Sequence, residues 1–89
     1  MTLRRFWFEF EFAVGASAPL GTRLGCGVTA QDVDEARQLV FERVFKGLAK
    51  PRIARVLEDV DVSSLDASHV LPNMGNALVR GVWFPLGYV

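Results

Sequence analysis

An alternation of aromatic and acidic residues runs through Leu3-Arg4-Arg5-Phe6-Trp7-Phe8-Glu9-Phe10-Glu11-Phe12, near the beginning of the chain. Successive side chains of a β-strand point to opposite faces of a sheet, so the four Phe share one face and Trp7, Glu9 and Glu11 share the other. The pattern predicts a first strand over residues 3–14, with its Phe face covered by another element. Because an exposed aromatic strand with unpaired backbone groups promotes aggregation, we expect this strand in the middle of the sheet.

The next part of the chain predicts a second strand and a helix. Small residues, Gly and Pro over 15–21 indicate a loose connection to a strand at 23–28. In that strand Cys26 falls on the core side, and two Gly on the other side mark a close approach or a bulge. Apolar residues at helical spacing predict a helix over 30–47, capped by Thr29. This helix is the expected cover of the Phe face.

Two further strands complete the predicted sheet. Residues 53–60 alternate poorly, which suits an edge strand, whereas 78–84 are apolar on both sides of Arg80, which is typical of a central strand. The 89 residues are expected to form a single domain, 1–89. The predicted fold class is α+β: a four-stranded mixed sheet with one helix packed on one face.

The order of these elements, ββαββ, resembles the β-grasp architecture of ubiquitin-like domains. The resemblance is carried by element order over most of the chain and by a helical turn expected at Ser63-Ser64-Leu65-Asp66, before the last strand. It implies that the first and last strands lie side by side and parallel in the centre of the sheet. It implies no activity, because one fold serves many functions.

The composition favours a domain that needs a partner. Apolar residues make up 51% of the chain, and eight Gly raise the apolar share above the 45–50% usual for globular domains. A chain with one Cys forms no internal disulfide, and one Cys with one His cannot supply the four ligands of a structural zinc site. We therefore expect no metal and no cofactor, and a protein partner or a second copy of the chain that covers apolar surface.

The charge pattern argues against several locations and partners. Ten basic and ten acidic residues leave no net charge, which argues against broad contact with nucleic acid or anionic membranes. Glu9 and Glu11 interrupt the apolar run that would otherwise, after Arg4-Arg5, resemble a signal peptide. The chain also lacks a run of 18 apolar residues. We therefore expect a cytoplasmic protein without a membrane span, with its cysteine reduced.

Two motifs invite a chemical interpretation. Cys26 and His69 are the one thiol–imidazole pair of the chain, but a cysteine nucleophile needs a base within hydrogen-bonding reach. The alternation around Cys26 instead predicts an inert core residue. The stretch Asp59-Val60-Asp61-Val62-Ser63 has the oxygen spacing of a calcium loop, yet Ser64 and Val70 stand where that loop requires Gly and Glu. The sequence thus predicts no catalytic and no metal-binding residue.

Surface residues suggest where a partner docks. The face of the sheet opposite the helix is the expected contact surface, because aromatic residues and Arg dominate interface energetics. The interface candidates on and around it are Trp7, Glu9, Glu11, Arg80 and Trp83. An open alternative is that Arg80 pairs with Glu9 or Glu11 across the sheet, and that His69, Asn73 and Arg80 only structure the connection before the last strand.

The favoured function is therefore a non-catalytic small protein-interaction module: an adaptor, an immunity-type inhibitor or a subunit of a small complex. The first alternative is a nucleic-acid-contacting accessory protein that uses Lys46, Lys50, Arg52 and Arg55. No aromatic residue is interleaved in that cluster, and a solvated helix end explains it as well. The second alternative is a small enzyme that uses Cys26 and His69.

Overall fold

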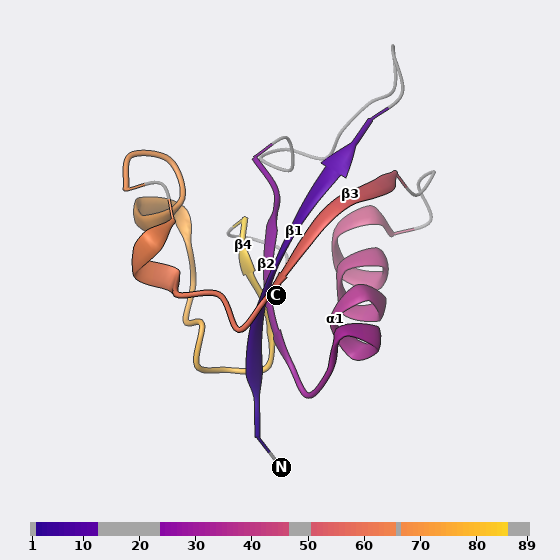
Figure 1. Ribbon diagram of the computed structural model, residues 1–89, viewed down its shortest axis with the longest axis horizontal. Coiled ribbons are helices and arrows are strands. Elements are labelled where there is room, and N and C mark those ends of the chain that lie inside the picture. Colours follow the sequence, from indigo (N-terminus) through magenta and orange to yellow (C-terminus); the bar gives the residue numbers. More distant parts are fainter. Residues whose placement is uncertain (1, 13–23, 47–50, 66, 86–89) are drawn as a thin grey trace.

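A four-stranded antiparallel sheet forms the centre of the protein. The computed structural model describes residues 2–12, 24–46, 51–65 and 67–85. Its strands are β1 (Arg4–Glu11), β2 (Cys26–Ala30), β3 (Arg52–Glu58) and β4 (Gly81–Phe84), in the order β3-β1-β2-β4. Helix α1 (Val33–Val40) lies on one side of the sheet, and the segment between β3 and β4 lies on the other (Figure 1). The α+β class and the packing of a helix on one face agree with the sequence prediction.

Strand β1 is central, as predicted. It pairs antiparallel with β2, where Phe6 stands opposite Val28, and with β3, where Trp7 stands opposite Leu57. Its hydrogen-bonding groups are therefore engaged on both sides, which removes the aggregation hazard of an aromatic edge. Strand β3 is at the edge of the sheet, which also agrees with its poor alternation.

The Phe face of β1 packs against the helix, as predicted. Phe6 and Phe8 are fully buried in one cluster with Val40 and Val44. Phe10 and Phe12 are partly buried at the border of this cluster, where Phe45 meets both rings. Burying rings of this size is the main favourable contribution to folding on this side of the sheet.

The helix begins later than its predicted cap. The carboxylate of Asp32 accepts a hydrogen bond from the Glu35 amide (2.8 Å), and Oε1 of Glu35 accepts one from the Gln31 amide (2.9 Å). These two bonds satisfy amides that have no partner inside the helix. Thr29 is therefore not the cap: it belongs to β2, and its Oγ1 donates to the Ala77 carbonyl oxygen (2.5 Å).

A π-helical segment extends the helix. It is η1 (Phe41–Phe45), and it follows α1 directly. The Lys46 amide donates to the Phe41 carbonyl oxygen (3.0 Å), and Lys46 adopts left-handed dihedrals that end the helix. The end predicted near residue 47 lies outside the described residues.

The β-grasp arrangement is not confirmed. Strand β2 stands between β1 and β4, so the first and last strands are not neighbours, and the three pairings of the sheet are antiparallel rather than mixed. Strand β4 pairs with β2 at the border of the sheet instead of lying in its centre. The physical reason is a close fit between β4 and the glycines of β2, described below.

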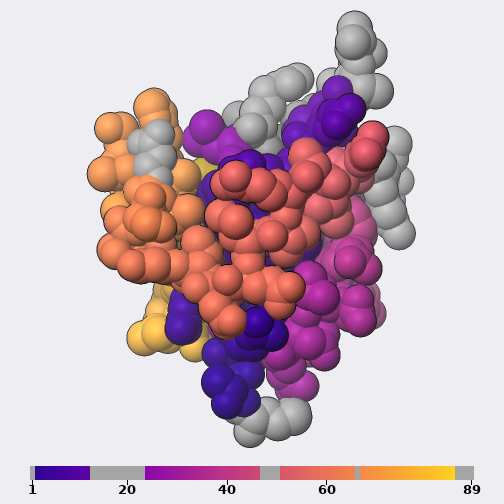
Figure 2. Space-filling view, in the orientation of Figure 1, coloured from indigo at the N-terminus to yellow at the C-terminus, as the bar shows by residue number. Residues whose placement is uncertain are grey.

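The segment between β3 and β4 forms a third layer. It contains the short 3-10 helices η2 (Val62–Ser64) and η3 (Leu71–Asn73). Figure 2 shows this segment, in orange, and the helix, in magenta, at opposite sides of the molecule. Its apolar residues pack against Trp7, Trp83 and Phe84. The sheet face opposite the helix, expected to be open, is therefore covered by the chain itself.

Candidate functional site

The two tryptophans are buried between the sheet and the third layer. Trp7 is 4% exposed and Trp83 is 2% exposed. Their ring centroids lie 6.2 Å apart, and Trp7 also packs on Phe84 at 5.5 Å. The expectation that these indoles form an exposed contact face is therefore wrong: neither is available as a surface anchor in this conformation.

Glycines in and beside β2 make room for the indoles. A Cβ at Gly27 would overlap the six-membered ring of Trp83, and a Cβ at Gly25 would lie 2.7 Å from Cζ2 of Trp7. Of the two alternatives that the sequence offers for these Gly, a close approach or a bulge, the close approach is thus confirmed. Gly25 also has φ of 131°, which side-chain-bearing residues rarely adopt.

A bulge in β4 aims Trp83 at this space. Gly27 stands opposite Phe84 and Val28 stands opposite Val82, so Trp83 is the extra residue of β4. Consecutive residues Trp83 and Phe84 therefore join the same cluster, while Val82 joins the cluster under the helix. Burial on both faces, rather than a central position, accounts for the continuous apolarity of this strand.

The acidic candidates of β1 hold structural contacts. Glu9 accepts a hydrogen bond from Nε1 of Trp7 (3.2 Å) and forms an ion pair with Arg55 (3.4 Å). Glu11 is exposed and stands opposite Arg52 of β3. Neither carboxylate pairs with Arg80, so that alternative is wrong. Trp7, Glu9 and Glu11 do not line the pocket beside the turn before β4, which is described below.

The turn before β4 presents apolar side chains to solvent. Leu78 is 73% exposed and Val79 is 57% exposed, and with Leu24 they are the large apolar residues most open to solvent among those described. The turn is fixed at its start, where Oδ1 of Asn76 accepts from the Leu78 amide (2.9 Å) and Thr29 binds the Ala77 carbonyl. Leu78 and Val79 thus project from a pinned turn.

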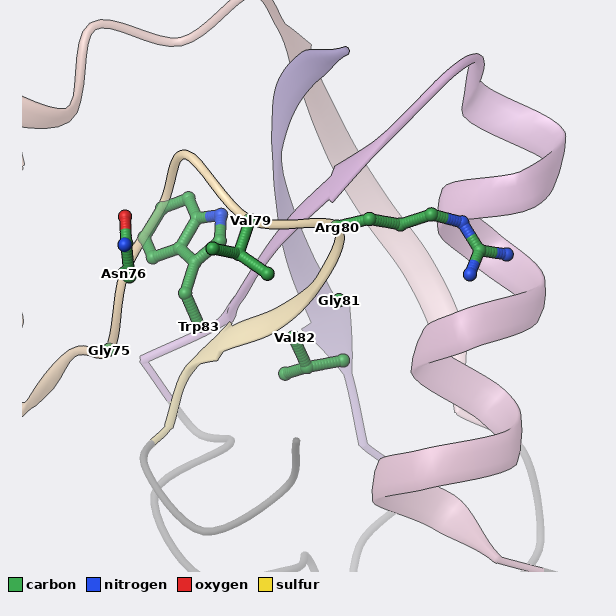
Figure 3. Close-up of a pocket in the computed structure, with 7 residues that line it drawn as sticks. All are labelled: Gly75, Asn76, Val79, Arg80, Gly81, Val82 and Trp83. Atoms are coloured by element: carbon green, nitrogen blue, oxygen red, sulfur yellow. The ribbon is translucent and has the colours of Figure 1, made fainter.

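Arg80 fixes the end of the same turn to the helix. Its Nη2 lies 2.9 Å from Oε2 of Glu35, and the side chain extends from the turn toward the helix (Figure 3). The hydrogen bond from Arg80, with a further one from the Gln31 amide, lowers the pKa of Glu35. The same contact raises the pKa of Arg80. Arg80 therefore stays protonated, and its charge is balanced by the carboxylate of Glu35.

A small pocket adjoins the exposed turn. It has a volume of about 170 Å³, and its lining residues come from the connection to β4 and from β4 itself (Figure 3). They are Gly75, Asn76, Val79, Arg80, Gly81, Val82 and Trp83. Two of the predicted interface candidates, Arg80 and Trp83, are thus brought together here. A pocket and exposed aliphatic side chains side by side are the features of a docking surface.

The candidate nucleophile and base are kept apart. Cys26 is fully buried in the cluster under the helix, and burial raises the pKa of its thiol to about 12. His69 is exposed in the layer on the opposite face of the sheet, where its carbonyl accepts from Nδ2 of Asn73 (2.9 Å). Cys26 thus has the protonated, inaccessible thiol predicted for a core residue, and Asn73 has the structural role that the sequence left open.

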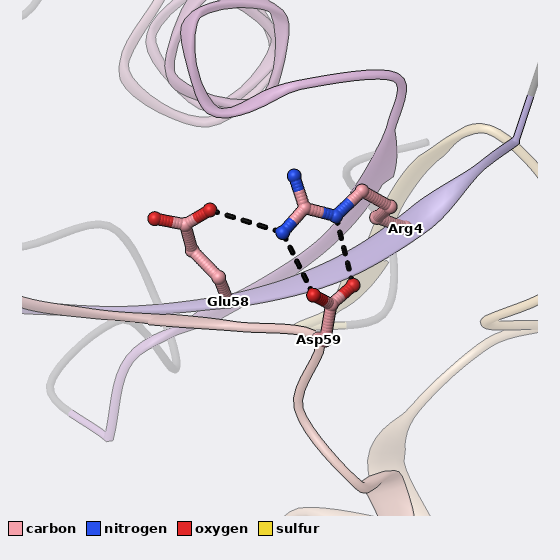
Figure 4. A network of polar contacts seen from close by, with 3 residues as sticks. All are labelled: Arg4, Glu58 and Asp59. Carbon is pink, nitrogen blue, oxygen red and sulfur yellow. Dashed lines mark hydrogen bonds and ion pairs between the residues drawn. The ribbon is translucent and has the colours of Figure 1, made fainter.

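The acidic stretch after β3 forms local contacts. Asp59 forms a bidentate ion pair with Arg4, and Glu58 forms a second ion pair with the same guanidinium (Figure 4). Asp61 caps η2: its carboxylate accepts hydrogen bonds from the amide and the hydroxyl of Ser63. These two bonds lower the pKa of Asp61. Among the described residues, no group of three or more His, Cys, Asp or Glu side chains is placed to hold a metal ion.

The basic cluster is spread along two elements. Lys46 ends η1, whereas Arg52 and Arg55 lie on β3, and Arg55 pairs with Glu9. Lys50 lies outside the described residues. Nothing in this placement favours a phosphate-binding surface over solvated charges.

Sequence reasoning missed Leu78 and Val79 as candidates. Both were included in the predicted last strand, because exposed aliphatic residues in a turn have the composition of a strand. The available signal was Asn76, a residue that favours turns, directly before them.

Comparison with known protein families, with curated proteins and with solved structures finds no match to this chain. In the part of the chain that the structure describes, no helix has the length and apolar character needed to span a membrane.

Proposed function

We propose that the protein is a non-catalytic protein-interaction module whose contact surface is the Leu78–Val79 turn with the adjoining pocket. The observation that carries the proposal is the exposure of two large aliphatic side chains on a turn that is fixed at both ends. A flexible loop would lose conformational entropy on binding, whereas a pinned turn has already lost most of it. The partner is another protein or a second copy of the chain. A cytoplasmic setting belongs to the proposal, because Cys26 is a free thiol.

The size of the pocket supports a protein partner over a metabolite. Pockets for small molecules usually measure about 300–1,000 Å³. A volume of about 170 Å³ instead suits one inserted side chain. Leu78 and Val79 then form the apolar rim around it.

Site-specific photo-crosslinking tests this surface. A benzophenone amino acid replaces Leu78, and the protein is irradiated in the cells that naturally produce it. We expect covalent adducts with a protein, identified by mass spectrometry, or with a second copy of the chain. The matched control carries the same group at Gln38, an exposed residue of α1. Protein adducts of equal yield at both positions, or none at position 78, would contradict the proposal, and adducts with nucleic acid would favour the accessory-protein alternative.

A further inference from the structure

Among the residues that the structure describes, one buried side-chain donor has no hydrogen-bond partner. The indole Nε1 of Trp83, a residue only 2% exposed, makes no hydrogen bond within the described part of the chain. The other indole provides the contrast, because Nε1 of Trp7 donates to Glu9. Buried polar groups are nearly always paired in native proteins, so an unpaired donor points to an acceptor outside the described part of the chain.

The residue that carries this donor lines the pocket. Trp83 and Val79 line it together, and Nε1 faces the side of the pocket on which Val79 lies (Figure 3). Val79 is 57% exposed, so a change of its rotamer would meet little packing and would open a path to Nε1. A cavity of about 150 Å³ accommodates a molecule the size of benzene. This pocket, at about 170 Å³, therefore has room for a group of similar size, such as a carbonyl together with one short aliphatic side chain.

The polar side chains at the pocket offer hydrogen-bond donors, which would bind an acceptor. Asn76 uses Oδ1 to accept from the Leu78 amide, so its Nδ2 remains as a second donor, on the side of the indole opposite Nε1 (Figure 3). The charges around the pocket are balanced: Arg80 is paired with Glu35, and the second cation, Arg43 beside Gly81, is offset by Glu42, which also raises the pKa of Arg80. Two donors in a neutral, largely apolar setting favour an uncharged carbonyl over an anion.

We propose that the pocket receives a main-chain carbonyl and one short aliphatic side chain from an apolar peptide segment of the partner protein. The carbonyl accepts from Nε1 of Trp83, and the aliphatic group replaces solvent between Val79 and Val82. This inference rests on the proposed function and specifies the chemistry by which the surface recognises its partner.

Indole NMR signals test the inference on the intact protein. The chain has two Trp, so a ¹⁵N-Trp-labelled sample gives two indole N–H signals, and Trp7 serves as the internal reference. The probe is N-methylisobutyramide, which carries a branched aliphatic group and a neutral carbonyl. We expect saturable downfield movement of the Trp83 signal and a constant Trp7 signal. No movement up to the solubility limit of the probe, or parallel movement of both signals, would overturn the inference.

A matched anion and two variants sharpen the test. Isobutyrate has the same aliphatic group with a carboxylate; binding equal to or tighter than that of the amide would overturn the neutral-carbonyl assignment. Asn76→Asp keeps the acceptor for the Leu78 amide but removes the donor, and should weaken the probe about three- to tenfold. Gln38→Glu makes the same change of charge on α1 and should leave probe affinity unchanged. Equal affinity in the wild type and Asn76→Asp would count against the inference, whereas crosslinking at position 78 would still stand.

Discussion

The six-membered ring of Trp83 lies against the main chain of Gly27, in the space where any other residue would place its Cβ. This contact couples the bulge of β4 to β2 and joins the last strand to the sheet. It also explains why a glycine, which normally weakens a strand, stands inside β2.

Gly27→Ala should therefore destabilise the protein. Overpacking of a filled core typically costs about 1–3 kcal/mol, and here the obstacle is a rigid indole held by Trp7 and Phe84. Urea denaturation measures the loss. In the Trp83→Ala background the space is empty, so Gly27→Ala should cost far less. Equal costs in both backgrounds would show that the two residues do not interact.

The Phe face should show graded sensitivity. Phe8 is fully buried, so Phe8→Ala should cost about 3–5 kcal/mol. Phe10 is only partly buried, and Phe10→Ala should cost less, roughly 1–3 kcal/mol, because part of its ring already contacts solvent. Chemical denaturation of both variants gives the comparison. A larger loss for Phe10→Ala would contradict the packing described for β1.

Much of this layout could be predicted from the sequence, because it depends on local periodicity. The alternation around Phe6 and Phe8 fixes the face that meets the helix, and the helical spacing up to Val44 supplies the cover. The strand order could not be predicted in this way. Whether β4 joins β1 or β2 depends on the fit of Trp83 over Gly27, which are far apart in the sequence and linked by no periodic pattern.

The candidate site was predicted only in part. The sequence predicts Arg80 and Trp83 as interface candidates near the last strand, and both line the pocket. Trp7 was expected to be exposed because a period of two reveals the face of a residue but not what covers that face. The cover comes from the irregular segment around Val70, whose apolar residues follow neither period.

The thiol of Cys26 should be nearly inert in the folded protein. The thiolate is the reactive form, and burial raises the pKa of this thiol to about 12, so almost none is ionised at neutral pH. A thiol reagent such as DTNB should modify it only as fast as the protein unfolds. A Cys introduced by Ala67→Cys, at an exposed position, gives the rate for an open thiol. Comparable modification rates at both positions would contradict the burial of Cys26 and favour the enzyme alternative.

Asp59 should make stability depend on pH in the acid range. Its carboxylate receives hydrogen bonds from Nε (2.8 Å) and Nη2 (2.7 Å) of Arg4, and this pairing holds the pKa of Asp59 below its usual value (Figure 4). A lowered pKa in the folded state stabilises the protein fully above the unfolded-state pKa of about 3.9, and this stabilisation is lost as pH falls through the folded-state pKa.

Asp59→Asn isolates that contribution. Asn tolerates the left-handed φ of 55° at this position, so the substitution removes charge with little backbone strain. We expect the stability difference from the wild type to be modest, because the pair is exposed, and to be largest above about pH 5. It should shrink as pH falls below that range, as followed by urea denaturation at a series of pH values. Glu58→Gln is the matched control, since Glu58 makes one longer contact of 3.1 Å to the same guanidinium and should have a smaller effect. A stability difference that stays constant down to the lowest pH at which the protein folds would show that the Arg4–Asp59 pair does not stabilise the folded state through its charge.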